Sequence, residues 1–337
     1  MKEAVLYEKK KGNEVRCNLC NHHCTISESK RGICGVRENR DGVLMSLTYG
    51  KLIAGHVDPI EKKPLFHFHP GSLSYSIASV GCNFRCLFCQ NADISQMPAE
   101  SGVISGESHS PEAVVEAALE AGCKTIAYTY TEPTVFFEFA YDTAKLATEK
   151  GLKNVFVSNG YMTVDAVDRI SPYLHAANID LKAFDDKFYK KICGARIAPV
   201  LETLKHIKAK GIHLEVTTLL IPGLNDDERL LKELAAFIVD SLGRETPWHV
   251  SRFHPTFKLL DRPSTSPDLI RRARAIGMDA GLLYVYTGNL PGDAGENTLC
   301  HNCGTTLIER FGFEVSQNRI FKGNCPECGV HVPGVWE

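Results

Sequence analysis

The sequence predicts an α/β protein, a partial (β/α)6 barrel with a small cysteine-rich module at each end. Strand-like apolar segments alternate with helical segments through the middle of the chain, a pattern typical of a parallel sheet covered by helices. Cysteines gather near both termini at metal-ligand spacings. We therefore expect a Cys-rich module at residues 1–72, the barrel core at 73–290 and a ribbon-like module at 291–337.

The composition is that of a globular protein of ordinary polarity, long enough for one large domain with small appendages. A formal net charge of −2 argues against nucleic acid or an acidic membrane surface as a partner. The first residues contain no apolar signal core, and no apolar run approaches the roughly 20 residues of a membrane span. Eleven of the thirteen cysteines fall into three groups, as metal sites do in a reducing compartment. We expect a cytoplasmic metalloprotein without membrane association.

The first cysteine group has the spacing C-x2-C-x3-C-x9-C, with two histidines between its members. Four thiolates in a loop-rich stretch are typical of a structural zinc site, and zinc is the metal we expect here. A second iron–sulfur cluster could use the same ligands, and the sequence separates the two poorly. The ligands are Cys17, Cys20, Cys24 and Cys34. Residues 50–72, with several prolines, glycines and histidines, should link this module to the core.

The core begins with an alternating segment at residues 74–80 that leads into the second cysteine group. Further strands are expected at 125–130, 154–157, 178–181, 214–221 and 249–253, with a possible seventh at 282–286. Ser110 followed by Pro111 has the signature of a helix start, an N-cap and a first-turn proline. Helices are expected at 112–121, 135–150, 164–173, 200–210 and 226–241. Such units place their strand ends on one rim, where barrels carry their active sites.

The loop at residues 81–91 has the strongest chemical signal in the chain. Cys82, Cys86 and Cys89, spaced C-x3-C-x2-C, can bind three irons of a 4Fe–4S cluster, and no fourth cysteine lies nearby in the sequence. An iron without a protein thiolate can bind S-adenosylmethionine (SAM) and pass an electron to its sulfonium, which yields a carbon-centred radical. The alternative is a zinc knuckle short of one ligand. Phe88 and the glycine before the first cysteine favour the cluster.

Polar residues follow the predicted strands and should face this loop from the same rim. The Thr-Glu-Pro motif at 131–133 could receive the SAM ammonium, or it could simply cap the next helix. Asp180 and Lys182 share a strand face and could bind ligand groups or pair with each other. His254 taken alone would more often be a core histidine than a ligand. The expected SAM and substrate pocket consists of Phe88, Glu132, Ser158, Asn159, Asp180, Lys182 and His254, with Lys182 and His254 as candidate catalytic residues.

The last cysteine group consists of two C-x2-C pairs. Paired knuckles separated by strand-like residues at 305–308 and 319–321 predict a zinc ribbon. A rubredoxin-like iron is the alternative, because tetrahedral sites of four sulfurs accept either metal. The ligands are Cys300, Cys303, Cys325 and Cys328.

Over about residues 75–260, these motifs together resemble the activating enzymes of glycyl radical enzymes, such as the pyruvate formate-lyase activating enzyme. The resemblance implies that the three loop cysteines hold the cluster and that the motif at 131–133 takes the SAM amino group. It also implies that residues 180–182 and 253–254 line the SAM and radical pocket.

Two positions depart from those activating enzymes. Val157 stands where they tend to have an acidic residue, and Thr217 stands where they often have a basic one. Both departures weaken the case for recognition of a glycyl loop.

Nearly end to end, the chain is similar to the radical SAM member of the AmmeMemoRadiSam system, named for its association with AMMECR- and Memo-type proteins. The motifs that carry this similarity are Cys-x2-Cys-Asn-His-His-Cys near the start, residues 58–65, residues 130–134 and the terminal cysteine pairs. The resemblance implies a radical SAM fold, a partial TIM-like barrel, and it makes the AMMECR- and Memo-type proteins candidate partners.

The function we expect is reductive cleavage of SAM by a 4Fe–4S cluster to a 5′-deoxyadenosyl radical, which abstracts hydrogen from an unidentified substrate. That substrate is a protein, as in glycyl radical enzyme activation, or a small molecule. The cofactors are the cluster, SAM and one or two structural zinc ions, and the electron comes from a reductant such as flavodoxin or ferredoxin. Two alternatives remain, an RNA-modifying radical SAM enzyme that grips nucleic acid with its ribbon and a non-catalytic metal-binding scaffold.

Overall fold

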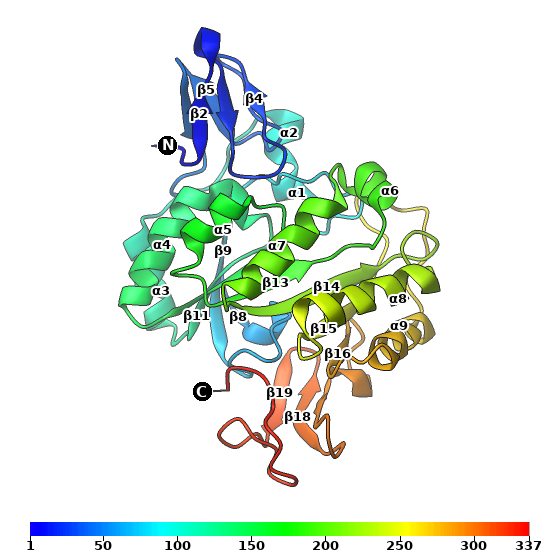
Figure 1. Cartoon of the computed structure of the whole chain (residues 1–337). Coiled ribbons are helices and arrows are strands. Elements are labelled where there is room, and N and C mark those ends of the chain that lie inside the picture. Colours follow the sequence, from blue (N-terminus) through cyan, green and yellow to red (C-terminus); the bar gives the residue numbers. More distant parts are fainter. Residues whose placement is uncertain (337) are drawn as a thin grey trace.

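Seven parallel strands and one antiparallel edge strand form the central sheet of the computed structural model, which describes residues 1–336 (Figure 1). The strand order is β16-β15-β14-β13-β12-β11-β9-β8, so neighbours in the sheet follow one another along the chain. The parallel strands are β9 (Leu73–Ala78), β11 (Thr125–Tyr128), β12 (Lys153–Ser158), β13 (Ala176–Asp180), β14 (His213–Leu220), β15 (Trp248–Arg252) and β16 (Val285–Gly288). The seven strands expected from the sequence are all present, and the sheet is open, with β8 and β16 as its edges.

The edge strand β8 (Ala54–Pro59) corrects one expectation. Residues 50–72 were expected only to link the N-terminal module to the core, yet β8 pairs antiparallel with β9 from Ala54 opposite Ala78 to Pro59 opposite Leu73. Most of β8 is exposed or half-buried, so it lacks the apolar alternation that marks a strand in sequence. The sheet therefore starts before residue 72.

Helices connect the parallel strands and pack against the outside of the sheet (Figure 1). They are α3 (Pro111–Glu120), α4 (Phe137–Glu149), α5 (Val164–Ile170), α7 (Ile197–Ala209), α8 (Glu228–Phe237) and α9 (Pro267–Asp279). Ser110, Thr163, Asp227 and Ser266 each cap a helix by accepting a hydrogen bond from the backbone N–H three residues on. Helix α9 was not expected, although Ser266-Pro267 repeats the Ser110-Pro111 signature. Within residues 1–336, no helix combines the length and apolar character needed to cross a bilayer.

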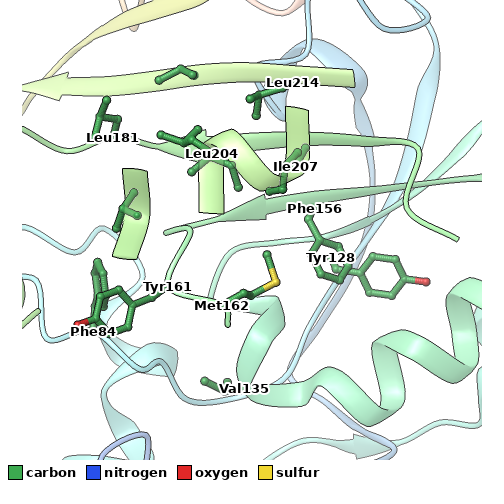
Figure 2. Packing of buried hydrophobic residues seen from close by; sticks show 14 of the residues in the cluster. Phe84, Tyr128, Val135, Phe156, Tyr161, Met162, Leu181, Leu204, Ile207 and Leu214 are labelled. Carbon is green, nitrogen blue, oxygen red and sulfur yellow. The ribbon is translucent and has the colours of Figure 1, made fainter. Parts of the chain in front are cut away.

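Large apolar side chains fill the space between helices and sheet (Figure 2). Tyr128 and Phe156, on neighbouring strands, have ring centroids 5.3 Å apart, and Phe84 packs edge-on against Tyr161 at 5.1 Å. Such aromatic pairs contribute about 0.5–1.5 kcal/mol beyond the burial of their area. Phe84 belongs to the cysteine loop and is only 1% exposed. The loop is therefore anchored in the core.

The other face of the sheet has a small core of its own. Alternate residues of a strand point to opposite faces, so Ala127 and Val155 lie on the side away from the main core. There they pack with Ile60, Leu65 and Phe68, from the segment that follows β8. The segment that follows β8 thus covers this face of the sheet, and its residues Lys62, Lys63 and Pro64 line the cavity described below.

The N-terminal module consists of two three-stranded antiparallel sheets with orders β1-β6-β5 and β2-β3-β4 (blue in Figure 1). The strands are β1 (Lys2–Glu3), β2 (Tyr7–Lys9), β3 (Val15–Cys17), β4 (Thr25–Ile26), β5 (Arg37–Arg40) and β6 (Val43–Ser46). A further short strand, β7 (Lys51–Leu52), pairs with β10 (Glu107–Ser108). Buried Arg37 reaches Glu138 of α4 and ties the module to the core.

The C-terminal module is a three-stranded antiparallel sheet of β17 (Thr298–Leu299), β18 (Thr306–Phe311) and β19 (Glu314–Asn318) (orange and red in Figure 1). The expectation of a strand at 319–321 is wrong. Gly312, with φ +62°, lets the chain turn directly after β18, so the returning strand comes earlier in the sequence. His67 holds the module to the core through Pro333 O and Tyr286 Oη, both 2.6 Å away.

Candidate active site

The cysteine loop follows β9 at one end of the sheet. The helices α1 (Ala92–Ser95) and α2 (Met97–Ser101) come directly after it. Two backbone hydrogen bonds hold the loop against residues 189–193, from Arg85 N to Cys193 O at 2.8 Å and from Leu87 N to Ile192 O at 3.0 Å. Backbone hydrogen bonds and the buried Phe84 thus stabilise the loop conformation.

The three loop thiols are free and differ in their surroundings. Cys82 Sγ accepts a hydrogen bond from Phe84 N at 3.3 Å, and Cys89 Sγ lies 3.3 Å from Ser95 Oγ. Burial raises the pKa of Cys82 and Cys89, and the nearby Glu132 carboxylate adds to the rise at Cys82. A hydrogen bond with the Cys193 thiol lowers the pKa of Cys86. Burial therefore disfavours the thiolate forms of Cys82 and Cys89.

One cavity of about 510 Å³ lies beside this loop. Its size falls in the range of small-molecule sites, about 300–1,000 Å³. It brings together the three loop cysteines and the predicted residues Phe88, Glu132, Ser158, Asn159, Asp180 and Lys182. These side chains come from the ends of successive parallel strands, as the barrel-rim argument predicts.

Glu132 joins the ends of two neighbouring strands. Its Oε1 accepts hydrogen bonds from Thr134 N at 3.0 Å, Thr134 Oγ1 at 2.6 Å and Ser158 Oγ at 2.8 Å. Its Oε2 accepts one from Asn159 N at 2.8 Å. Burial raises the pKa of this carboxyl against the effect of these donors. Glu132 therefore caps the following 3-10 turn, which was the alternative role considered for the Thr-Glu-Pro motif. It also keeps one lone pair on Oε2 for a ligand.

Asn159 connects this strand end to the cysteine loop. Its Nδ2 donates to Asn83 Oδ1 at 2.7 Å and lies 3.8 Å from Cys82 Sγ. Hydrogen bonds to a ligating sulfur orient it and tune a metal bound there.

Asp180 and Lys182 face the same way, as their spacing predicts. Lys182 Nζ lies 2.8 Å from Asp180 Oδ2 and 5.6 Å from the centre of the Phe88 ring. Burial by itself would lower the pKa of Lys182, but Asp180 and the neighbouring cysteines hold it well above its usual value. The site thus presents a cation fixed between a carboxylate and an aromatic ring.

His254 does not join the site, which corrects the prediction from the sequence. Its side chain is exposed, its Nδ1 lies 3.2 Å from Ser264 Oγ, and it is absent from the cavity wall. The strand β15 ends at Arg252, so His254 lies two residues into the following loop, where the strand alternation no longer directs its side chain. Of the expected titratable pocket residues, Glu132, Asp180 and Lys182 line the cavity, whereas His254 does not.

The structure adds residues that sequence reasoning missed. Lys62 and Lys63 line the cavity and bind the Asp58 carboxylate at 2.8 and 2.6 Å, and Tyr130 Oη donates to the same carboxylate. Burial lowers the pKa of Lys63 to about 8. Cys193, next to Cys86, was also missed. The charged residues at 58–63 could have been predicted as site residues from the sequence, whereas an isolated cysteine such as Cys193 has no motif that marks it.

The two terminal cysteine groups differ in geometry. The sulfurs of the four C-terminal cysteines all lie within 4.8 Å of one another, as a shared metal ion requires. Cys300 Sγ lies 3.6 Å from Cys328 Sγ, and Cys303 Sγ lies 3.7 Å from Cys325 Sγ. Tetrahedral zinc with Zn–S near 2.3 Å needs sulfurs about 3.8 Å apart. These four could therefore hold one metal ion. The N-terminal four line a separate small cavity.

Comparison with known proteins shows which proteins this chain resembles. Residues 76–235 match the family model described as the radical SAM superfamily. An uncharacterized protein of Methanocaldococcus jannaschii is 48% identical over 334 residues, which cover 98% of this chain and 99% of the relative. The pyruvate formate-lyase 1-activating enzyme of Escherichia coli is 21% identical over 162 residues, 48% of this chain and 66% of that enzyme. A radical SAM methyltransferase from Sphaerobacter thermophilus shares the fold, with TM-score 0.51, 16% identity and coverage of 68% of this chain and 71% of that one.

Proposed function

Because the chain belongs to the radical SAM superfamily, we propose that Cys82, Cys86 and Cys89 hold a 4Fe–4S cluster whose fourth iron is open to SAM. When bound, this pair supplies reductive cleavage of the sulfonium to a 5′-deoxyadenosyl radical, which abstracts hydrogen from the substrate. The observation that carries the proposal is the convergence of three thiols from one loop and the polar ends of several strands on one cavity. A site for electron transfer alone would normally supply four thiolates.

The cavity residues take separate roles in this proposal. Glu132 accepts the SAM ammonium with the remaining lone pair of Oε2, while its other hydrogen bonds keep Ser158 and Asn159 in place. Lys182 and Asp180 offer a cation and an anion for the SAM carboxylate and ribose hydroxyls. Because Lys182 is held over Phe88, its position is set before a ligand arrives, which lowers the entropic cost of binding.

The substrate would meet an uncharged part of the wall. Val157, Thr217 and Ser251 line the cavity, and Thr217 Oγ1 is buried without a hydrogen-bond partner among the described residues. A buried hydroxyl without a partner favours a ligand that supplies one. This wall suits a neutral polar group of a protein or small molecule better than a full charge.

The finer assignments follow the sequence resemblance. We propose that the chain is the radical SAM member of the AmmeMemoRadiSam system, with AMMECR- and Memo-type proteins as partners and flavodoxin or ferredoxin as the one-electron reductant. The motif at 58–65 is one of those that carry the resemblance, and its residues Lys62 and Lys63 line the cavity. The C-terminal four cysteines would hold structural zinc, because four thiolates leave no position for a substrate.

Anaerobic reconstitution with iron and sulfide, followed by reduction and addition of SAM, tests the proposal. We expect a cluster whose electron paramagnetic resonance changes with SAM, and formation of 5′-deoxyadenosine. Cys82→Ala, Cys86→Ala and Cys89→Ala should each abolish SAM cleavage, whereas Cys123→Ala, a matched buried cysteine outside the three groups, should not. If a variant without all three loop cysteines still produced 5′-deoxyadenosine, the proposal would be wrong.

A further inference from the structure

The four N-terminal cysteines line a small cavity that reaches the cysteine loop of the candidate active site at Asn83, between Cys82 and Phe84. Cys17, Cys20, Cys24 and Cys34 all line it. Asn83, the residue after Cys82, lines it too, and His22 on its wall lies 2.8 Å from Asn83 O through Nε2. The N-terminal thiols therefore lie directly behind the loop proposed to hold the first cluster.

The spacing of these sulfurs differs from that of the C-terminal group. One tetrahedral ion with Zn–S near 2.3 Å requires all four sulfurs to lie about 3.8 Å apart. The C-terminal four meet this requirement, whereas no three of the N-terminal sulfurs, all in the described part of the chain, lie within 4.8 Å of one another. A 4Fe–4S cluster binds each thiolate to a different iron, so its sulfurs stand further apart than those on a single ion.

Two buried residues that line this cavity have donor atoms without a partner in the described part of the chain. Arg37 is 2% exposed, and its Nη2 pairs with Glu138, but Nε and Nη1 find no acceptor within residues 1–336. Asn83 Nδ2, also buried, has no acceptor in the same part of the chain. Both residues line the cavity. Buried donors without acceptors are rare, and a cluster offers sulfide and thiolate sulfurs as acceptors together with negative charge.

We propose that Cys17, Cys20, Cys24 and Cys34 hold a second 4Fe–4S cluster, with one thiolate on each iron and with Arg37 and Asn83 as donors to its sulfurs. A cluster with all four irons ligated has no open position for SAM, so it serves electron transfer. The inference departs from the zinc expected at these residues from the sequence. This inference rests on the proposed function only in taking the group at Cys82, Cys86 and Cys89 to be the first 4Fe–4S cluster.

The test uses the full chain with Cys82, Cys86 and Cys89 all changed to Ala, which removes the first cluster. After anaerobic reconstitution, we expect about four irons and four acid-labile sulfides per chain. The reduced protein should give a cluster resonance that SAM does not change. Adding Cys20→Ser and Cys24→Ser to this variant should remove the iron and sulfide and leave the zinc of the C-terminal group.

Two results would overturn the inference. One is a triple variant that contains no acid-labile sulfide, and the other is zinc bound at both terminal groups of that variant. If the triple variant does not fold, the same measurement applies to the wild-type chain. There, Cys20→Ser with Cys24→Ser should lower the sulfide content from about eight to about four per chain. An unchanged sulfide content would contradict the second cluster and leave the first one intact.

Discussion

Glu138→Ala should destabilise the protein strongly, because it leaves the Arg37 cation buried without its carboxylate. Arg37 and Glu138 have side chains 2% and 1% exposed, and Arg37 Nη2 lies 2.6 and 2.8 Å from the two carboxylate oxygens. The carboxylate also accepts Val5 N at 2.9 Å, so its loss leaves a second donor unpaired. Removal of one partner from a buried ion pair costs about 3–5 kcal/mol. We expect a loss of this size in the free energy of unfolding.

The measurement is urea unfolding followed by circular dichroism on chains isolated without iron–sulfur clusters. Glu233→Ala is the matched control, because Arg229 and Glu233 form an equally short ion pair of 2.6 Å with side chains 70% and 44% exposed. An exposed helix pair of this kind contributes about 0.3–0.5 kcal/mol. Hydrogen exchange should place the loss from Glu138→Ala in the N-terminal sheets. If Glu138→Ala cost no more than Glu233→Ala, water would reach the pair and the argument from burial would fail.

Three further predictions concern Glu132 in the candidate active site, Cys325 in the C-terminal module and the buried His67. Glu132→Gln turns one carboxylate oxygen into a donor that faces Ser158 Oγ or Asn159 N. SAM cleavage, measured as 5′-deoxyadenosine formed, should then fall about 10- to 150-fold, which corresponds to the 1.5–3 kcal/mol of a charged hydrogen bond. Wild-type activity of this variant would refute the positioning role of Glu132. Cys325→Ser should lower the zinc content and unfold the C-terminal module while the SAM-responsive resonance persists; a folded, metal-free ribbon would contradict it. Burial lowers the pKa of His67 to about 4. Between pH 6.5 and 4, His67 is therefore protonated in the unfolded chain but neutral in the folded chain. Stability should fall with decreasing pH by up to about 1.4 kcal/mol per unit in that window, and His67→Asn should flatten the dependence measured by urea unfolding.

Local patterns in the sequence were enough for the main elements and for the cysteine groups. Buried strands such as β11 are mainly apolar, and helices such as α3 begin with a capping serine and a proline, so both are visible over a few residues. The cysteine spacings carry chemistry by themselves, because a loop with three thiols leaves one iron of a cluster open wherever that loop lies. The parallel pairing of the strands was expected from the same alternation of strands and helices.

Tertiary structure decided whatever depends on contacts between distant segments. The edge strand β8 is stabilised by pairing with β9 and shows little apolar pattern of its own. His254 is exposed because the chain leaves the strand two residues earlier. Glu132 accepts hydrogen bonds from Ser158 and Asn159 at the end of the neighbouring strand, as well as from Thr134. The spacing of the sulfurs, which separates a site for one ion from a site for a cluster, depends on how the modules fold. Residue types and spacings thus determine which chemistry is available to this protein, whereas the packing of segments far apart in the chain determines which side chains meet to use it.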